Sequence, residues 1–125
     1  MNQLVFRSWI LLLYFDFVMR FRSFQDLHDL IRKRRDWPIR DSLGPSSNEL
    51  CYAVDLACVL YFKKVLCLQR SAVTTRVLRR YGYDAEMVIG AQVLPFRSHA
   101  WVEINKIVVN DKPYMREIYQ VLERC

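Results

Sequence analysis

Residues 101–109 read Trp-Val-Glu-Ile-Asn-Lys-Ile-Val-Val, and this stretch decides the fold class. Its central pair, Asn105-Lys106, separates two short runs that are rich in β-branched residues. Asparagine tolerates the left-handed backbone that a two-residue turn needs, so the stretch predicts a β-hairpin with strands at 101–104 and 107–109. A third β-rich run at 85–90 predicts another strand, and together these runs indicate a small antiparallel sheet.

Upstream of the sheet, apolar residues recur at helical spacing. Ser46-Ser47-Asn48-Glu49 has the form of a capping box and opens the run from Leu50 to Phe62. Because this run is hydrophobic on nearly all sides, it predicts a central buried helix that packs on one face of the sheet. A further helix is expected from about Cys67 to Arg80, with Gly82 as its C-terminal cap.

The N-terminal part of the chain is expected to add helices only. Residues 9–15 are wholly apolar, but Asp16 follows, and the uncharged stretch is far too short to span a bilayer. We therefore expect an amphipathic or largely buried helix over 4–21 and a capped amphipathic helix over 23–35. Helices followed by a small sheet indicate an α+β fold.

Length and composition exclude several classes of protein. A chain of 125 residues with a hydrophobic fraction of 53% is typical of one packed domain, which excludes a multidomain enzyme and intrinsic disorder. The net charge of +6 favours an acidic partner, which is a nucleic acid, a membrane surface or an acidic peptide. Charge alone does not choose among these three.

The four cysteines suggest neither a disulfide framework nor a metal site. Cys51 and Cys58 are separated by about 10 Å of helical rise, which is too far for a disulfide. We expect both to be buried thiols, and Cys125 to be a free thiol at a frayed chain end. With only two histidines in the sequence, a zinc site has little to build on, so no metal is expected. This use of cysteine indicates a reducing, cytoplasmic compartment.

Cys67, His99 and Asp111 have the chemistry of a cysteine nucleophile and its base. A thiol becomes reactive at a helix N-terminus beside an imidazole, and a third group holds that imidazole in the right tautomer. Cys67 begins a predicted helix, whereas His99 and Asp111 lie at the open end of the predicted hairpin. Because such a triad needs convergence in space only, the three residues are candidates for one site.

The register of the hairpin tests this idea. With a strict two-residue turn, Asp111 lies opposite Ala100, and His99 points to the other face of the sheet. A one-residue bulge, a three-residue loop over 104–106 or a twist at the strand end would bring Asp111 to His99. We therefore predict one of these irregularities.

Three motifs in this order resemble the leader peptidase of lasso-peptide biosynthesis: Cys67-Leu-Gln-Arg-Ser-Ala-Val73, Ser98-His-Ala-Trp-Val-Glu103 and Val108-Val-Asn-Asp111. That family belongs to the transglutaminase-like, papain-related cysteine peptidases. The resemblance covers residues 50–124 closely and the first 50 residues only in general character. We expect the single domain over 1–125 to consist of a helical N-terminal part at 1–48 and a catalytic core at 49–125.

The resemblance also implies an activity. Cys67 would be the nucleophile, His99 the general base and then the general acid, and Asp111 the group that orients the imidazole. The leader of a ribosomal precursor would be removed, and the core peptide would go on to a separate macrolactam synthetase. A separate winged-helix protein would recognise the leader. No cofactor and no nucleic acid are expected, and membrane contact is not expected.

Further residues are candidates for binding the substrate. Arg70 and Arg97 are placed to steer an acidic leader, and Trp101 to form a pocket wall. The backbone N–H of Cys67 is expected to donate to the oxyanion.

Two alternatives stay open. One is transglutaminase-like acyl transfer, in which an amine replaces water and the same three residues act. The other is a non-enzymatic basic adaptor that binds nucleic acid or a membrane through Arg32–Arg35 and the N-terminal helix.

Overall fold

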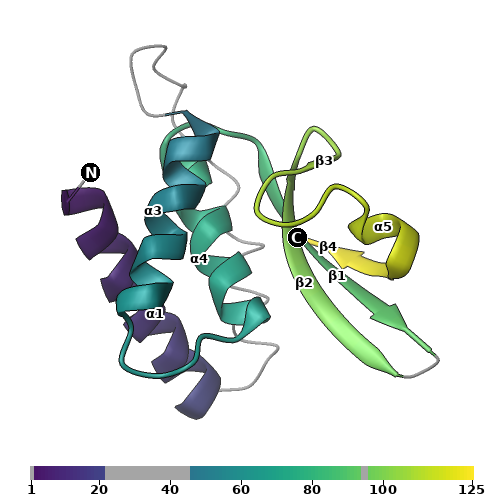
Figure 1. Cartoon of the computed structure of the whole chain (residues 1–125), viewed down its shortest axis with the longest axis horizontal. Coiled ribbons are helices and arrows are strands. Elements are labelled where there is room, and N and C mark those ends of the chain that lie inside the picture. The colour runs from purple at the N-terminus through teal and green to yellow at the C-terminus, as the bar shows by residue number, and fades with distance from the viewer. Residues whose placement is uncertain (1, 22–45, 94–95) are drawn as a thin grey trace.

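The computed structural model describes residues 2–21, 46–93 and 96–125. In these ranges the elements follow the order α1 (Asn2–Phe21), α3 (Ser47–Leu60), α4 (Cys67–Arg80), β1 (Ala85–Gln92), β2 (Arg97–Ile104), β3 (Ile107–Val108), α5 (Met115–Ile118) and β4 (Gln120–Arg124). The strands form one antiparallel sheet in the order β3-β2-β1-β4. Figure 1 shows α1, α3 and α4 gathered on one side of the molecule and the sheet on the other. The predicted α+β fold is confirmed, whereas the predicted helix over 23–35, with its basic run, lies outside the described residues.

The ends of α3 and α4 follow local sequence signals. The Ser46 side chain accepts a hydrogen bond of 3.2 Å from the Glu49 N–H, which confirms the capping box. At the C-terminal end of α4, Gly82 has a φ of 90° and donates to the Arg79 carbonyl, while Tyr83 donates to the Leu78 carbonyl. This pair of bonds is a Schellman motif, so the predicted cap by Gly82 is confirmed.

The helix that packs on the sheet is α4. It contacts both β1 and β2 as well as α1 and α3, and its residues are buried almost continuously from Gln69 to Arg79. The prediction of a central buried helix over 50–62 is wrong in this respect, because α3 exposes Tyr52, Val59 and Leu60. A helix whose residues are apolar on nearly all sides, as in α3, is therefore not buried on all sides in this protein.

Helix α1 has one face in the core and one apolar face outside. Leu12, Phe15 and Val18 are buried against the other helices, whereas Phe6 and Phe17 on the opposite face are more than half exposed. No helix among the described residues is long and apolar enough to cross a membrane.

Polar contacts fix α1 to the rest of the molecule. The Gln69 Nε2 donates to the Leu12 carbonyl at 2.7 Å, and Asp16 pairs with Lys63 at 2.8 Å. The Tyr61 hydroxyl also donates to Asp16. Burial, together with the Asp16 charge, raises the pKa of Tyr61 to about 12.

The predicted hairpin is present, with a two-residue turn. Asn105 and Lys106 have φ values of 52° and 67°, and Ile104 pairs with Ile107. The two central strands are longer than predicted, since β1 extends to Gln92 and β2 begins at Arg97. The edge strand β3 ends at Val108, one residue earlier than expected.

The two faces of the sheet belong to different cores. Met87 and Val102 join the large core formed with the helices, whereas Val88 and Trp101 join a smaller core with Met115 of α5. Neither α5 nor β4 was predicted as an element. The expected frayed end at Cys125 is wrong, because Cys125 is 1% exposed and exchanges two backbone hydrogen bonds with Met87.

Gly90 of β1 lies where the smaller core leaves no room for a side chain. A Cβ there would lie 2.7 Å from Trp101 Cη2 and 2.9 Å from Tyr119 Cβ. We expect Gly90→Ala to lower the free energy of unfolding by about 1–3 kcal/mol, because the buried Trp101 ring and Tyr119 must shift. Urea unfolding measures this loss, and Ser98→Ala in the same hairpin is the control. Equal stability of the two variants would contradict the close approach.

Candidate active site

His99 and Asp111 form a direct hydrogen bond. The His99 Nε2 lies 2.6 Å from the Asp111 Oδ2, and the two side chains are 25% and 18% exposed. The other carboxylate oxygen, Oδ1, accepts a bond of 2.8 Å from the Lys112 N–H. Each carboxylate oxygen is therefore held by a separate donor, which fixes the carboxylate relative to the ring.

Asn110 lies where the chain leaves the hairpin ladder, directly before Asp111 reaches His99. The hairpin ladder continues to Val109, whose N–H donates to the Val102 carbonyl. In the other direction, the Val102 N–H donates to the side-chain oxygen of Asn110 at 2.7 Å, where a regular ladder would have a backbone carbonyl as acceptor. The backbone thus leaves the sheet at residues 109–111, and Asp111 contacts His99 without a bulge or a longer turn. The predicted bulge and three-residue loop are both absent from this hairpin, and the chain instead leaves the ladder at Asn110.

Two aromatic rings lie beside the His99 imidazole. The ring of Tyr119 stacks at 5.4 Å between centroids and that of Trp101 at 6.1 Å. Gly90, the cross-strand partner of His99, leaves the space in which these rings meet. The imidazole is therefore held on one side by aromatic groups and at Nε2 by a carboxylate.

Cys67 is the first residue of α4 and is partly exposed. Helix α4 packs against β2, the strand that carries His99, and in its first turn Arg70 reaches the Asn110 carbonyl next to Asp111. The beginning of α4 therefore lies beside the segment that holds the acid. No hydrogen bond joins the Cys67 thiol to His99 among the described residues.

A model of the transglutaminase-like superfamily matches residues 11–124. The chain belongs to this superfamily. The transglutaminase-like chain is also similar to a curated protein, the microcin J25-processing protein McjB of Escherichia coli, with 43% identity over 56 residues. The match covers 45% of this chain and 27% of McjB, so the chain spans well under two thirds of that relative. No solved structure matches the chain significantly.

The structure changes the expectation for Trp101 in the transglutaminase-like chain. Its side chain is 0% exposed, and its indole N–H donates to Glu103 at 2.8 Å. Although burial alone raises the pKa of Glu103, hydrogen bonds from Arg124 and Trp101 hold that pKa below its ordinary value. Trp101 therefore packs beside the His99 imidazole within the smaller core. It exposes no surface to a peptide, contrary to the expectation that it binds substrate.

Arg70 and Arg97 have different environments. Arg70 donates to Asp55 and to the Asn110 carbonyl, so its guanidinium is engaged within the transglutaminase-like chain. Arg97, the first residue of β2, is exposed two residues before His99. Sequence reasoning missed Asn110 and Tyr119 as residues of this site, although Asn110 directly precedes Asp111 in the sequence.

The cysteines of the transglutaminase-like chain differ in predicted reactivity. Burial, with the nearby Asp55 charge, raises the pKa of Cys51 to about 11, and burial likewise raises that of Cys58 to about 11. Alkylation needs the thiolate, and a thiol with such a pKa is about 0.1% ionised at pH 8. We expect iodoacetamide at pH 8 to modify Cys67 first, and Cys58 labelling to accelerate as the pH rises toward 11. Peptide mapping by mass spectrometry measures this order, and equal rates at Cys58 and Cys67 at pH 8 would contradict it.

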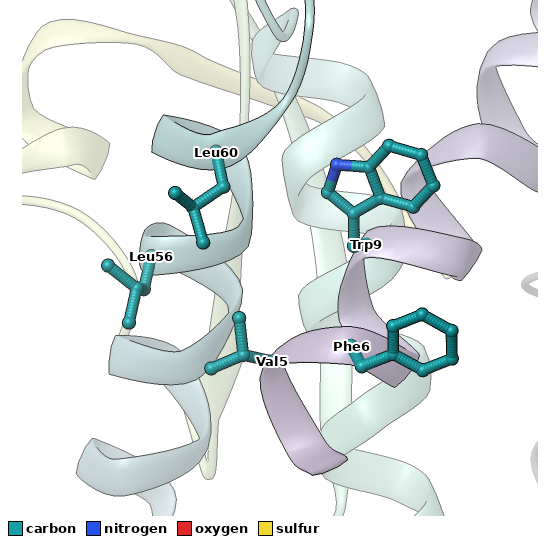
Figure 2. Close-up of a pocket in the computed structure, with 5 residues that line it drawn as sticks. All are labelled: Val5, Phe6, Trp9, Leu56 and Leu60. Atoms are coloured by element: carbon teal, nitrogen blue, oxygen red, sulfur yellow. The ribbon is translucent and has the colours of Figure 1, made fainter. Parts of the chain in front are cut away.

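An apolar groove of about 530 Å³ lies between α1 and α3. Figure 2 shows its lining, which consists of Val5, Phe6, Trp9, Leu56 and Leu60. None of these side chains ionises or acts as a nucleophile. The groove of the transglutaminase-like chain is therefore no candidate for catalysis, and the candidate catalytic residues lie on β2, after β3 and at the beginning of α4.

Proposed function

We propose that the chain is a cysteine peptidase that removes the leader from a lasso-peptide precursor, with Cys67, His99 and Asp111 as its catalytic triad. The observation that carries the proposal is the hydrogen bond of 2.6 Å between His99 and Asp111, beside a helix that begins at Cys67. Membership of the transglutaminase-like superfamily and the similarity to a microcin-processing protein support it further.

The hydrogen bond also supports distinct roles for the two ring nitrogens in this proposal. When Nε2–H donates to Asp111, Nδ1 is the nitrogen left to accept the thiol proton. The carboxylate keeps the ring in this tautomer and stabilises the imidazolium that forms. Asp111 is itself fixed by the Lys112 N–H, so the ring cannot turn freely.

The proposed reaction has two steps. The Cys67 thiolate attacks the carbonyl carbon at the leader–core junction, and the imidazolium of His99 protonates the leaving amine of the core peptide. The leader then remains as a thioester on Cys67. Water, deprotonated by His99, attacks this thioester, so the leader leaves as a carboxylic acid and the thiol is restored. The backbone N–H of Cys67, at the beginning of α4, donates to the oxyanion in both steps.

The proposal includes partners and a compartment. The substrate is a precursor peptide, a separate winged-helix protein supplies leader recognition, and a macrolactam synthetase consumes the product in the cytoplasm. The net charge of +6 steers an acidic or mixed leader toward the chain. The exposed position of Arg97 near His99 supports it as one of the steering charges.

Incubation with a leader-containing precursor, with and without the recognition protein, tests the proposal. Mass spectrometry is expected to show a free core peptide and a leader that has gained water. A leader joined to an added amine would instead support acyl transfer, which superfamily membership makes the second candidate. Intact precursor under all conditions, with binding that weakens steeply with salt, would support the basic adaptor and overturn the peptidase.

A further inference from the structure

Arg70 connects the helix that carries the nucleophile to the segment that carries the acid. It lies in the first turn of α4, three residues after Cys67. Its Nη2 donates to the Asn110 carbonyl at 2.7 Å, and its Nε donates to Asp55 Oδ1 of α3 at 2.8 Å. The carbonyl it holds belongs to the residue directly before Asp111. One guanidinium thus spans α3, α4 and the segment that leaves the sheet.

Asn110 is held from two directions at this point. Its side chain accepts from the Val102 N–H of β2, and its backbone carbonyl accepts from Arg70. The side chain is 6% exposed, so the segment is fixed inside the structure and not at its surface. Because Asp111 follows in the chain, these two bonds set where its carboxylate lies relative to His99.

We propose that Arg70 is a positioning residue, which fixes Asp111 against His99 and places both relative to Cys67. This inference rests on the proposed function and replaces the expectation that Arg70 binds the substrate. The fork geometry explains why arginine is present, since two separate N–H groups point to two acceptors on different elements. A lysine ammonium is a single point charge and cannot reproduce both bonds in this geometry.

The variant Arg70→Met tests the proposal, because methionine keeps the apolar stem and removes both donors. Asp55 is 46% exposed and stays hydrated without its partner, so the fold is expected to remain. We expect kcat to fall roughly 10- to 100-fold with KM nearly unchanged, since a small misplacement of catalytic groups has this size of effect. Arg70→Lys is expected to recover only part of the loss. Arg80→Met, at an exposed position of the same helix, is the matched control and keeps full activity.

Comparison with Asp111→Asn separates positioning from other roles. If Arg70 acts through Asp111, the loss caused by Arg70→Met shrinks to less than about threefold in the Asp111→Asn background. A rise in KM that adds fully to the Asp111 effect would assign Arg70 to substrate binding and overturn the proposal. A fall in melting temperature with additive kinetics would assign it a structural role only and also overturn it.

The rate of Cys67 alkylation gives the same comparison without a substrate. Arg70→Met and Asp111→Asn are each expected to slow this alkylation, and the double variant is expected to slow it no further than either single variant.

If Cys67→Ala still cleaves precursor, the proposed function fails whatever Arg70 does. If Cys67→Ala is inactive and Arg70→Met keeps its full kcat, only the positioning role fails.

Discussion

Cys67→Ala is expected to abolish cleavage of the precursor, with a fall in kcat of at least about 10⁴-fold. In the proposed reaction the Cys67 thiolate forms the thioester, and alanine offers no replacement. The side chain is partly exposed at the first position of α4, where alanine is compatible with a helix, so the fold is expected to persist. Time courses of product formation, followed by mass spectrometry, measure the change.

Cys58→Ala is the matched control for this variant. Cys58 is also partly buried, but it lies in α3 and its pKa is raised to about 11, which disfavours the thiolate. The control is expected to cleave as the unchanged protein does. Normal turnover by Cys67→Ala, or equal loss in both variants, would show that Cys67 is not the nucleophile.

The second large effect is expected at the pair His99 and Asp111. His99→Ala removes the base and should lower kcat about as far as loss of the nucleophile does, because the members of a triad act as one unit. Asp111→Asn should lower kcat by roughly 10³- to 10⁴-fold, since an amide holds the imidazole in the wrong tautomer as readily as in the right one. Steady-state kinetics with the same precursor measure both losses.

Asp84→Asn makes the same chemical change at an exposed carboxylate and is the control for Asp111. It is expected to keep full activity. Activity of Asp111→Asn within a factor of a few of the control would mean that the contact of 2.6 Å has no catalytic role.

Local signals in the sequence were sufficient for several elements. Helix α4 runs from Cys67 to Arg80 as predicted. Its end was predictable because Gly82 adopts the positive φ of a helix C-cap, a backbone conformation that favours glycine. The turn at Asn105-Lys106 was predictable for the same reason. Such signals act over three or four residues and do not depend on the rest of the chain.

Other features depend on contacts between distant residues and were not predictable. At Asn110 the side chain replaces a ladder carbonyl as acceptor for the Val102 N–H, and the backbone carbonyl accepts from Arg70, forty residues earlier. The burial of Cys125 depends on its pairing with Met87 of β1. The sequence of α3 did not indicate which of its faces is buried, because a helix that is hydrophobic all round carries no polar face to mark the exposed side.

The two-sided helix α1 also sets how far the protein can be shortened. Its residues Leu12 and Phe15 are fully buried, and the Leu12 carbonyl holds Gln69, two residues after the proposed nucleophile. A fragment that lacks α1 would open the main core and leave the side-chain amide of Gln69 without the Leu12 carbonyl as its acceptor. A minimal enzyme therefore has to keep its first helix, and any fusion or immobilisation is better made through the outward face at Phe6 and Phe17 than by removing it.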